Sequence, residues 1–154
     1  MYFLGFDLGA NFGFAVLDQN CNRIDSGTWY FGVKTTKSLL SCDTKVTNLI
    51  SQYPPVIISY EKVNFFHKGT KAASAYGNYE AIVMLAAERN DTLLDQFSTG
   101  KVKKVATGFG NATKKEMEAA AYYRWNSYVP MDDNDADALH IARCGLLRFI
   151  GEKI

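Results

Sequence analysis

Apolar residues near the start of the chain come in short runs that are separated by turn-forming residues. The runs cover residues 2–6, 12–17 and 23–31. Gly9 and Asn11 separate the first two runs, and a polar turn at 19–22 separates the second run from the third. Short apolar runs with such spacers are typical of strands joined by tight turns. The pattern predicts an antiparallel meander whose first strand ends at Asp7.

The pattern changes to a helical period at residue 38. Apolar residues at 39, 42, 46, 49, 50 and 53 lie on one face of a helix, which Pro54 and Pro55 end. The remaining pattern predicts a strand over 56–60, a helix over 72–90, a strand over 93–97, a helix from Thr113 to about Tyr123 and a last helix from about Asn134. Residues 101–104 form a basic stretch with no element assigned. The alternation predicts an α/β fold: a five-stranded mixed β-sheet flanked by α-helices on both faces, in a single domain over residues 1–154.

The composition is that of a globular protein with a large aromatic core. Hydrophobic residues make up 47% of the 154 residues, including 10 Phe, 9 Tyr and 2 Trp, so neither a metal nor a disulfide is needed for folding. The net charge of +1 excludes nucleic-acid binding by gross charge but permits a local basic face. No apolar run reaches the roughly 18 residues of a membrane span, and no leader opens the chain. With three scattered cysteines, we expect a cytoplasmic protein that has no membrane partner.

Three carboxylates, Asp7, Glu61 and Asp137, stand at the ends of apolar elements or inside them. Each alone is explained by solvation or by the preference for acidic residues at helix starts. Their combination indicates a shared site, because a helical crossover makes strands 2–6 and 56–60 parallel neighbours and brings Asp7 and Glu61 to adjacent strand ends. A helix start that carries Asp137 can close the site. Clustered carboxylates match Mg²⁺ or Mn²⁺, and paired ions of this kind serve phosphodiester hydrolysis.

Four motifs follow one another along the chain. They are FLGFDLGANFGFAVLD at the start, ISYEKV in the predicted fourth strand, VKKVATGFGNATKKEM after the fifth strand and DNDADALHIA in the last helix. In this order and spacing they resemble the RuvC family of Holliday junction resolvases, within the ribonuclease H-like superfamily. The resemblance covers nearly the whole chain and implies a ribonuclease H-like fold and a nuclease that cuts junctions.

The resemblance implies catalytic roles for particular residues. Asp7, Glu61 and Asp137 fall on three of the family's four catalytic and metal-binding positions. Lys103 and Lys114 match lysines that flank the active site, and they would hold the scissile phosphate and offset developing charge.

The fourth catalytic position departs from the family. It lies three residues before the last of these catalytic positions, Asp137, and this chain has Asn134 there. An Asn oxygen can still face a metal or water, and Asp133 or Asp135 can substitute, so the fourth ligand stays open. Asp133 and Asp135 point about 100° to either side of Asn134 on a helix, which fits capping better than ligation.

The resemblance also implies DNA-binding residues and a dimer. Phe65 and Phe66 follow Glu61 where the family has an aromatic wedge that stacks at the junction centre, the alternative being that they pack in the core. Lys104 and Lys115 extend the basic patch of the flanking lysines. Outside the family motifs, further phosphate contacts could come from Lys34, Lys37, Lys62, Lys68 and Lys71, the alternative being that these lysines only solvate the surface. A homodimer with helix 72–90 at its interface would give two symmetric cuts to a two-fold junction.

Together these features predict a Mg²⁺-dependent endonuclease, with Mn²⁺ as a substitute, that resolves four-way DNA junctions by paired nicks with water as the nucleophile. The features are more similar to phage-encoded members of the family, which would act in the cytoplasm of a bacterial host. Two alternatives remain. Asn134 permits a catalytically weak or dead branched-DNA-binding protein. The Asp-Leu-Gly-Ala-Asn segment also resembles the phosphate loop of actin-like nucleotide-binding folds, although 154 residues hold one of that fold's two lobes.

Overall fold

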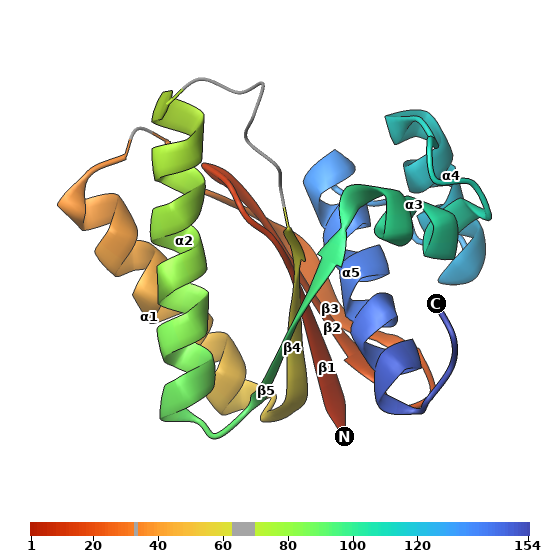
Figure 1. Ribbon diagram of the computed structural model, residues 1–154, viewed down its shortest axis with the longest axis horizontal. Coiled ribbons are helices and arrows are strands. Elements are labelled where there is room, and N and C mark those ends of the chain that lie inside the picture. Colours follow the sequence, from red (N-terminus) through yellow and green to blue (C-terminus); the bar gives the residue numbers. More distant parts are fainter. Residues whose placement is uncertain (33, 63–69) are drawn as a thin grey trace.

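A computed structural model describes residues 1–32, 34–62 and 70–154, without the side chains of residues 70–72. Five strands form one mixed sheet in the order β3-β2-β1-β4-β5 (Figure 1). The strands are β1 (Tyr2–Asp7), β2 (Asn11–Asp18), β3 (Arg23–Tyr30), β4 (Pro55–Lys62) and β5 (Leu93–Ser98). The first three strands are antiparallel, whereas β4 runs parallel to β1, and β5 runs parallel to β4. The predicted meander and the predicted mixed sheet are confirmed.

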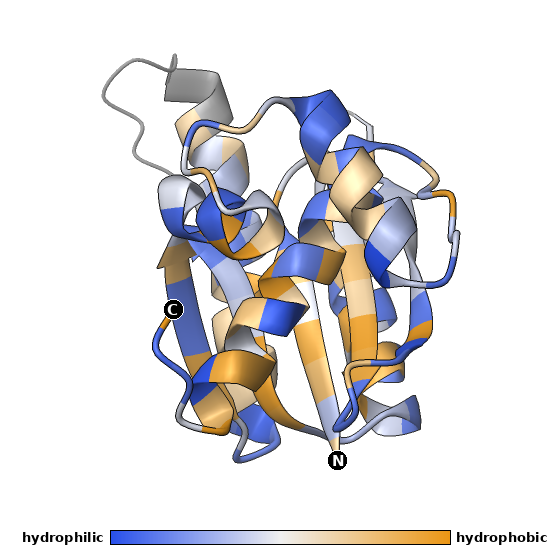
Figure 2. Cartoon of the chain, turned by 90° about the vertical axis from the view of Figure 1, so that its right-hand side faces the viewer, coloured by the Kyte–Doolittle hydropathy of each residue, from blue (hydrophilic) through white to orange (hydrophobic). Residues whose placement is uncertain are grey.

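Helices cover both faces of the sheet, as predicted (Figure 1). They are α1 (Thr36–Gln52), α2 (Thr70–Arg89), α3 (Thr99–Thr107), α4 (Lys114–Arg124) and α5 (Asp133–Phe149). Helices α1 and α2 cover one face, and α5 covers the other, with α3 and α4 packed outside it (Figure 1). Figure 2, which looks onto the second layer, shows mostly hydrophobic strands behind helices of mixed hydropathy.

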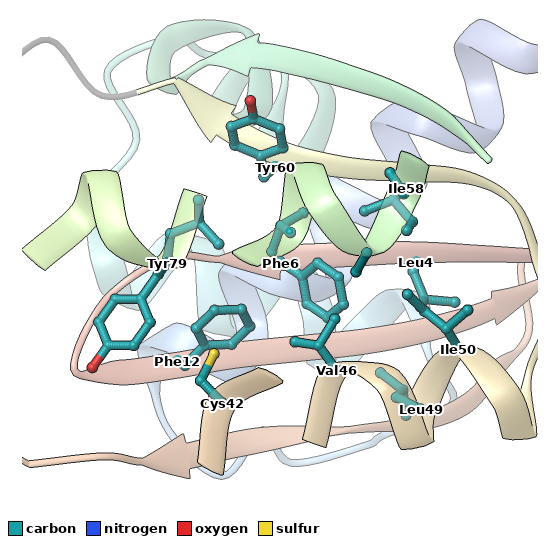
Figure 3. Close-up of a cluster of buried hydrophobic side chains, with 14 of the residues drawn as sticks. Leu4, Phe6, Phe12, Cys42, Val46, Leu49, Ile50, Ile58, Tyr60 and Tyr79 are labelled. Carbon is teal, nitrogen blue, oxygen red and sulfur yellow. The ribbon is translucent and has the colours of Figure 1, made fainter. Parts of the chain in front are cut away.

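The core between the sheet and the first helical layer is aromatic. Phe6 and Phe12 from the strands are buried with Tyr79 of α2 and with Cys42 and Val46 of α1 (Figure 3). Parallel strands that are covered on both faces are apolar on both faces, which explains the continuous apolar run of β1. On the other face, a second cluster joins β1 and β2 to the Ala-rich side of α5.

Helix α3 is the element that the sequence pattern did not predict. Its residues 99–107 include three lysines, so its apolar positions are few. The helix begins because Ser98 caps it, accepting a hydrogen bond from the backbone N–H of Lys101, and it ends at Gly108 in the left-handed conformation (φ 88°). By contrast, the capping box that Thr113 and Glu116 form at the start of α4 was predicted and is confirmed.

Two glycines let α5 lie directly on the sheet. A Cβ atom at Gly5 would stand 2.3 Å from the carbonyl oxygen of Ala138, and one at Gly13 would stand 2.1 Å from that of Asn134. A side chain at either position would therefore push the helix away. This close packing places the start of α5 beside the carboxyl end of β1.

In the parts of the chain that the structure describes, no helix has both the length and the apolar character needed to cross a bilayer.

Candidate active site

The three predicted carboxylates meet in one pocket. Phe6 of β1 pairs with Tyr60 of β4 in the parallel register, so Asp7 and Glu61 are the next residues on adjacent strands. Asp137, in the second turn of α5, faces the same space. The pocket has a volume of about 540 Å³. Its lining is mainly polar or charged: Asp7, Leu8, Gly9, Ala10, Asn11, Glu61, Thr99, Lys103, Lys114, Met117, Asp133, Asn134 and Asp137.

Three helices begin at this pocket. Thr99 is the first residue of α3, Lys114 the first of α4 and Asp133 the first of α5, and all three line it. The unpaired N–H groups at a helix N-terminus carry partial positive charge, which favours anions. At the carboxyl ends of β1 and β4, the fold therefore places a cluster of carboxylates beside a rim of helix N-termini that attracts anions.

The carboxylates raise one another's pKa. Burial raises the pKa of Asp7 well above its usual range, and the charges of Asp137, Glu61 and Asp133 raise it further. Burial, followed by the charges of Glu61 and Asp133, raises the pKa of Asp137 to about 7. Lys114 opposes both shifts. Near neutral pH the protein alone therefore carries a proton on part of this cluster, and an added positive charge would favour its release.

The donor chemistry of the pocket fits a hard divalent cation. Carboxylate oxygens are the preferred ligands of Mg²⁺ and Mn²⁺, and the raised pKa values show that the cluster lacks compensating charge. As the described side chains stand, no three acidic, His or Cys groups surround a single point. Asp7, Glu61 and Asp137 are the residues that would hold the cation.

Thr99 is a site residue that the sequence analysis missed. Its hydroxyl donates a hydrogen bond to Glu61 Oε1. On the other side, the hydroxyl of Tyr76 in α2 donates to the backbone carbonyl of Glu61 at 2.6 Å. The signal that would have found Thr99 is Ser98, a residue with N-cap preference directly after a strand, which places the next residue at a helix start.

The lysines that were predicted to contact DNA differ in where they lie. Lys103 of α3 and Lys114 of α4 line the pocket, as the flanking lysines were expected to do. Among the remaining candidates, Lys62, Lys104, Lys115 and Lys37 have exposed side chains away from the pocket lining, and Lys34 donates to Ser74 of α2. Phe65, Phe66 and Lys68 lie outside the described residues, as does the side chain of Lys71.

The start of α5 differs from the expectation for its acidic residues. The helix begins at Asp133, one residue earlier than predicted, so Asp132 is the N-cap and accepts the backbone N–H of Asp135 at 3.0 Å. The expectation that Asp133 and Asp135 act as caps is therefore wrong. Asp135 is fully buried and accepts hydrogen bonds from Tyr128 Oη at 2.6 Å and from the backbone N–H of Met131 at 2.8 Å. Asp133, by contrast, faces the pocket.

The fold and the acidic pocket define a ribonuclease H-like nuclease. The sequence profile described as "Crossover junction endodeoxyribonuclease RuvC" matches residues 3–145. The chain belongs to the RuvC family of crossover junction endodeoxyribonucleases, which resolve Holliday junctions. The predicted family and enzyme class are confirmed, and the actin-like alternative is excluded.

Individual relatives agree with this assignment. Proteins described as crossover junction endodeoxyribonuclease RuvC from Endomicrobium trichonymphae and Thermosipho melanesiensis are each 31% identical to the chain over 94% of its length, which covers 80% and 96% of their lengths respectively. The structure of Thermus thermophilus RuvC superposes with a TM-score of 0.85 at 19% identity, over 98% of this chain and 97% of that one. A second structure of that protein, in complex with a Holliday junction substrate, also superposes with a TM-score of 0.85, at 19% identity and over 99% and 98% of the two chains. Nucleases of this family depend on a divalent cation.

Proposed function

We propose that the chain resolves four-way DNA junctions with Mg²⁺ as its cofactor, for which Mn²⁺ can substitute, and that Asp7, Glu61 and Asp137 bind the cation. One observation carries the proposal: these residues come from β1, β4 and α5 and meet in a single pocket that Lys103 and Lys114 also line. An acidic cluster bordered by lysines suits a phosphodiester, because the lysines attract the phosphate that the carboxylates alone would repel.

The residues around the carboxylates supply the other parts of the reaction. Divalent cations in such a site stabilise the attacking and leaving oxygens of phosphodiester hydrolysis. Lys103 and Lys114 orient the scissile phosphate and offset the charge that develops on it. The N-termini of α3, α4 and α5 add partial positive charge at the same rim. Thr99 holds the Glu61 carboxylate in place through its hydroxyl. Water attacks the phosphorus while one bridging P–O bond breaks, which leaves one DNA end with a phosphate and the other with a hydroxyl, and no covalent bond forms between the enzyme and DNA.

The substrate is supported by a structural neighbour. The junction-bound structure of Thermus thermophilus RuvC has the same fold as this chain. The predicted wedge of Phe65 and Phe66, and the phosphate contacts of Lys62, Lys68, Lys71, Lys104 and Lys115, remain predictions. We place the protein, as a single domain over residues 1–154, in the cytoplasm of a bacterial cell, and a phage origin remains a hypothesis.

The experiment that tests this function compares substrates and metals. The wild-type protein should cut a synthetic four-way junction at symmetric positions with Mg²⁺ or Mn²⁺. It should cut a linear duplex of the same sequence far more slowly, and EDTA should stop cleavage. Junction binding without cleavage under all of these conditions would favour the inactive branched-DNA-binding alternative. Equal cleavage of both substrates would contradict the proposed junction selectivity.

We also propose that the protein acts as a homodimer through α2. The outer face of this helix carries Gly77, Ala81, Met84 and Leu85, and the last two are 49% and 54% exposed. Spacings of four and seven or eight residues place these side chains on one face of the helix. An exposed apolar face on a helix that already packs on α1 is suited to a second copy, and a two-fold dimer provides the two active sites that paired nicks require.

The dimer is tested by the molar mass in solution. Met84→Glu and Leu85→Glu should shift the protein from dimer to monomer in light scattering after size exclusion. Val129→Glu is the control, because Val129 is equally apolar, is 72% exposed and lies in the loop between α4 and α5. A wild-type monomer at micromolar concentration, or dimers of both α2 variants, would contradict this interface.

A further inference from the structure

The start of α5 brings two neighbouring residues, Asp133 and Asn134, to the lining of the acidic pocket, but they lie in different rows of the helix. Residues four apart in a helix lie nearly above one another, so Asp133 shares a row with Asp137. Asn134 shares the next row with Ala138 and Ala142. These two rows have different neighbours.

The backbone of the row of Asn134 packs closely against the sheet. The carbonyl oxygen of Asn134 would stand 2.1 Å from a Cβ at Gly13. A Cβ at Gly5 would stand 2.3 Å from the carbonyl oxygen of Ala138 and 2.3 Å from the backbone nitrogen of Ala142. Asn134 also lines the pocket, but its side chain is a neutral amide.

The row of Asp133 faces the carboxylates. The Asp133 side chain is 29% exposed and forms an ion pair with Lys114 at the start of α4. Its charge also contributes to the raised pKa values of both Asp7 and Asp137. Asp133 therefore lies within electrostatic reach of two of the carboxylates that define the site, with a cation already beside it.

We propose that Asp133, one residue before the position that the family resemblance marks, is the fourth carboxylate that faces the divalent cation in this chain. This inference rests on the proposed function. The shift by one residue keeps an acidic group in the pocket lining, where Asn134 contributes only a neutral amide. Lys114 holds Asp133 in the metal-free protein, and its ammonium group is at the same time positioned for the scissile phosphate.

Metal binding without DNA tests this assignment directly. Mn²⁺ binding to the metal-free protein would be measured by electron paramagnetic resonance or calorimetry at pH 8. Asp133→Asn, which keeps the size of the side chain, should weaken Mn²⁺ binding at least about 10-fold, whereas Asn134→Ala should weaken it less than about 3-fold. Asp133→Glu, which keeps the charge, should bind more tightly than Asp133→Asn. A greater loss for Asn134→Ala, or wild-type affinity for Asp133→Asn, would overturn the proposal.

Two controls keep the result interpretable. Asp91→Asn removes an exposed carboxylate in the turn between α2 and β5, at the opposite end of the sheet, and should leave Mn²⁺ affinity unchanged. The melting temperature of Asp133→Asn confirms that it is folded, and Asp133→Ser replaces it if it is not.

Cleavage of a four-way junction separates this inference from the function on which it rests. If Asp7→Asn is inactive while Asp133→Asn cuts and binds Mn²⁺ like the wild type, the role of Asp133 is wrong and the proposed function stands. If both variants cut like the wild type, the proposed metal site itself is wrong. Loss of both Mn²⁺ affinity and cleavage in Asp133→Asn would support the inference.

Discussion

The aromatic cluster beneath α1 and α2 is fully buried, whereas the carboxylates of the acidic pocket at the ends of β1 and β4 are partly buried, and burial has opposite consequences in the two regions. In the cluster, Phe12 packs against four other aromatic rings at centroid distances of 5.3 to 5.9 Å, and each contact favours the folded state. In the pocket, burial and like charge raise the pKa of Asp7 and Asp137, so ionised carboxylates there disfavour the folded state.

This difference separates stability from activity along a single strand. Phe6 and Asp7 are neighbours in β1, yet Phe6 belongs to the aromatic cluster and Asp7 to the pocket. The rigid sheet allows unfavourable charges to be held close together, because the energy that stabilises the fold comes from elsewhere. We therefore expect substitutions in the cluster to lower stability, and substitutions of the pocket carboxylates to lower activity while the fold persists.

The largest expected effect is in the cluster. Phe12→Ala removes a ring that is fully buried among Phe6, Trp29 and other aromatic side chains, and it should lower the free energy of unfolding by about 3 to 5 kcal/mol. Urea unfolding measures this change. Phe109→Ala is the control, since Phe109 is 70% exposed, and it should have little effect. A small effect of Phe12→Ala would show that the cluster is not the main source of stability.

A substitution in the pocket should affect activity instead. Asp137→Asn removes a charge that the proposed function uses to bind the cation, and we expect junction cleavage to fall by about 100-fold or more. The folded structure should persist, because the amide has nearly the same size as the carboxylate. Single-turnover cleavage with saturating Mg²⁺ measures the effect. Cleavage within a few-fold of the wild type would remove Asp137 from the site.

Thr99 should have a smaller effect on the same reaction. Thr99→Val keeps the shape of the side chain but removes the hydroxyl that donates to Glu61, and such supporting contacts affect activity by about 10-fold or more. Thr99→Ser, which keeps the hydroxyl, should restore the rate. Thr44→Val, on the exposed side of α1, should cut normally. Equal rates for Thr99→Val and Thr99→Ser would show that the hydroxyl does not position Glu61.

The smallest expected effect is on how the stability of the folded protein depends on pH. The folded-state pKa of Asp137 is about 7, above its ordinary value of 3.8, so the metal-free folded protein binds more protons than the unfolded chain between these values. Its stability should therefore fall as the pH rises from about 4 to 7. At pH 8, Asp137→Asn should melt at least about 2 °C above the metal-free wild type, and this difference should shrink toward pH 4. A lower melting temperature for Asp137→Asn at pH 8 would contradict the origin of the raised pKa.

Much of the site could be predicted from the sequence because strand register follows from topology. Once the helix over residues 38–53 is a crossover, the strands that end at Asp7 and Glu61 must be parallel, and their ends must meet. The sheet, its order of elements and the layers on both faces follow from the same hydrophobic pattern. The predicted carboxylates and flanking lysines accordingly lie together in the structure.

The parts that could not be predicted depend on where helices begin. Helix α3 is too short and too rich in lysine for its apolar period to be evident, so its first residue, Thr99, was not expected beside Glu61. In α5, several acidic residues in sequence can each act as the cap, and a difference of one residue decides whether Asp133 caps the helix or faces the pocket. Hydrogen bonds from β3 to the side chain of Asp132 select it as the cap, and such long-range contacts leave no local sequence signal.

The most direct test of the account is the cleavage and binding of one four-way junction by Asp7→Asn, measured with Mg²⁺ beside the wild type and Asp91→Asn. Asp7 lines the acidic pocket, whereas Asp91 lies at the other end of the sheet. We predict that Asp7→Asn binds the junction as tightly as the wild type or more tightly, because a repulsive charge is gone, and that it does not cut it. Asp91→Asn should bind and cut normally. Cleavage by Asp7→Asn at the wild-type rate would contradict the central claim that this pocket carries out the reaction.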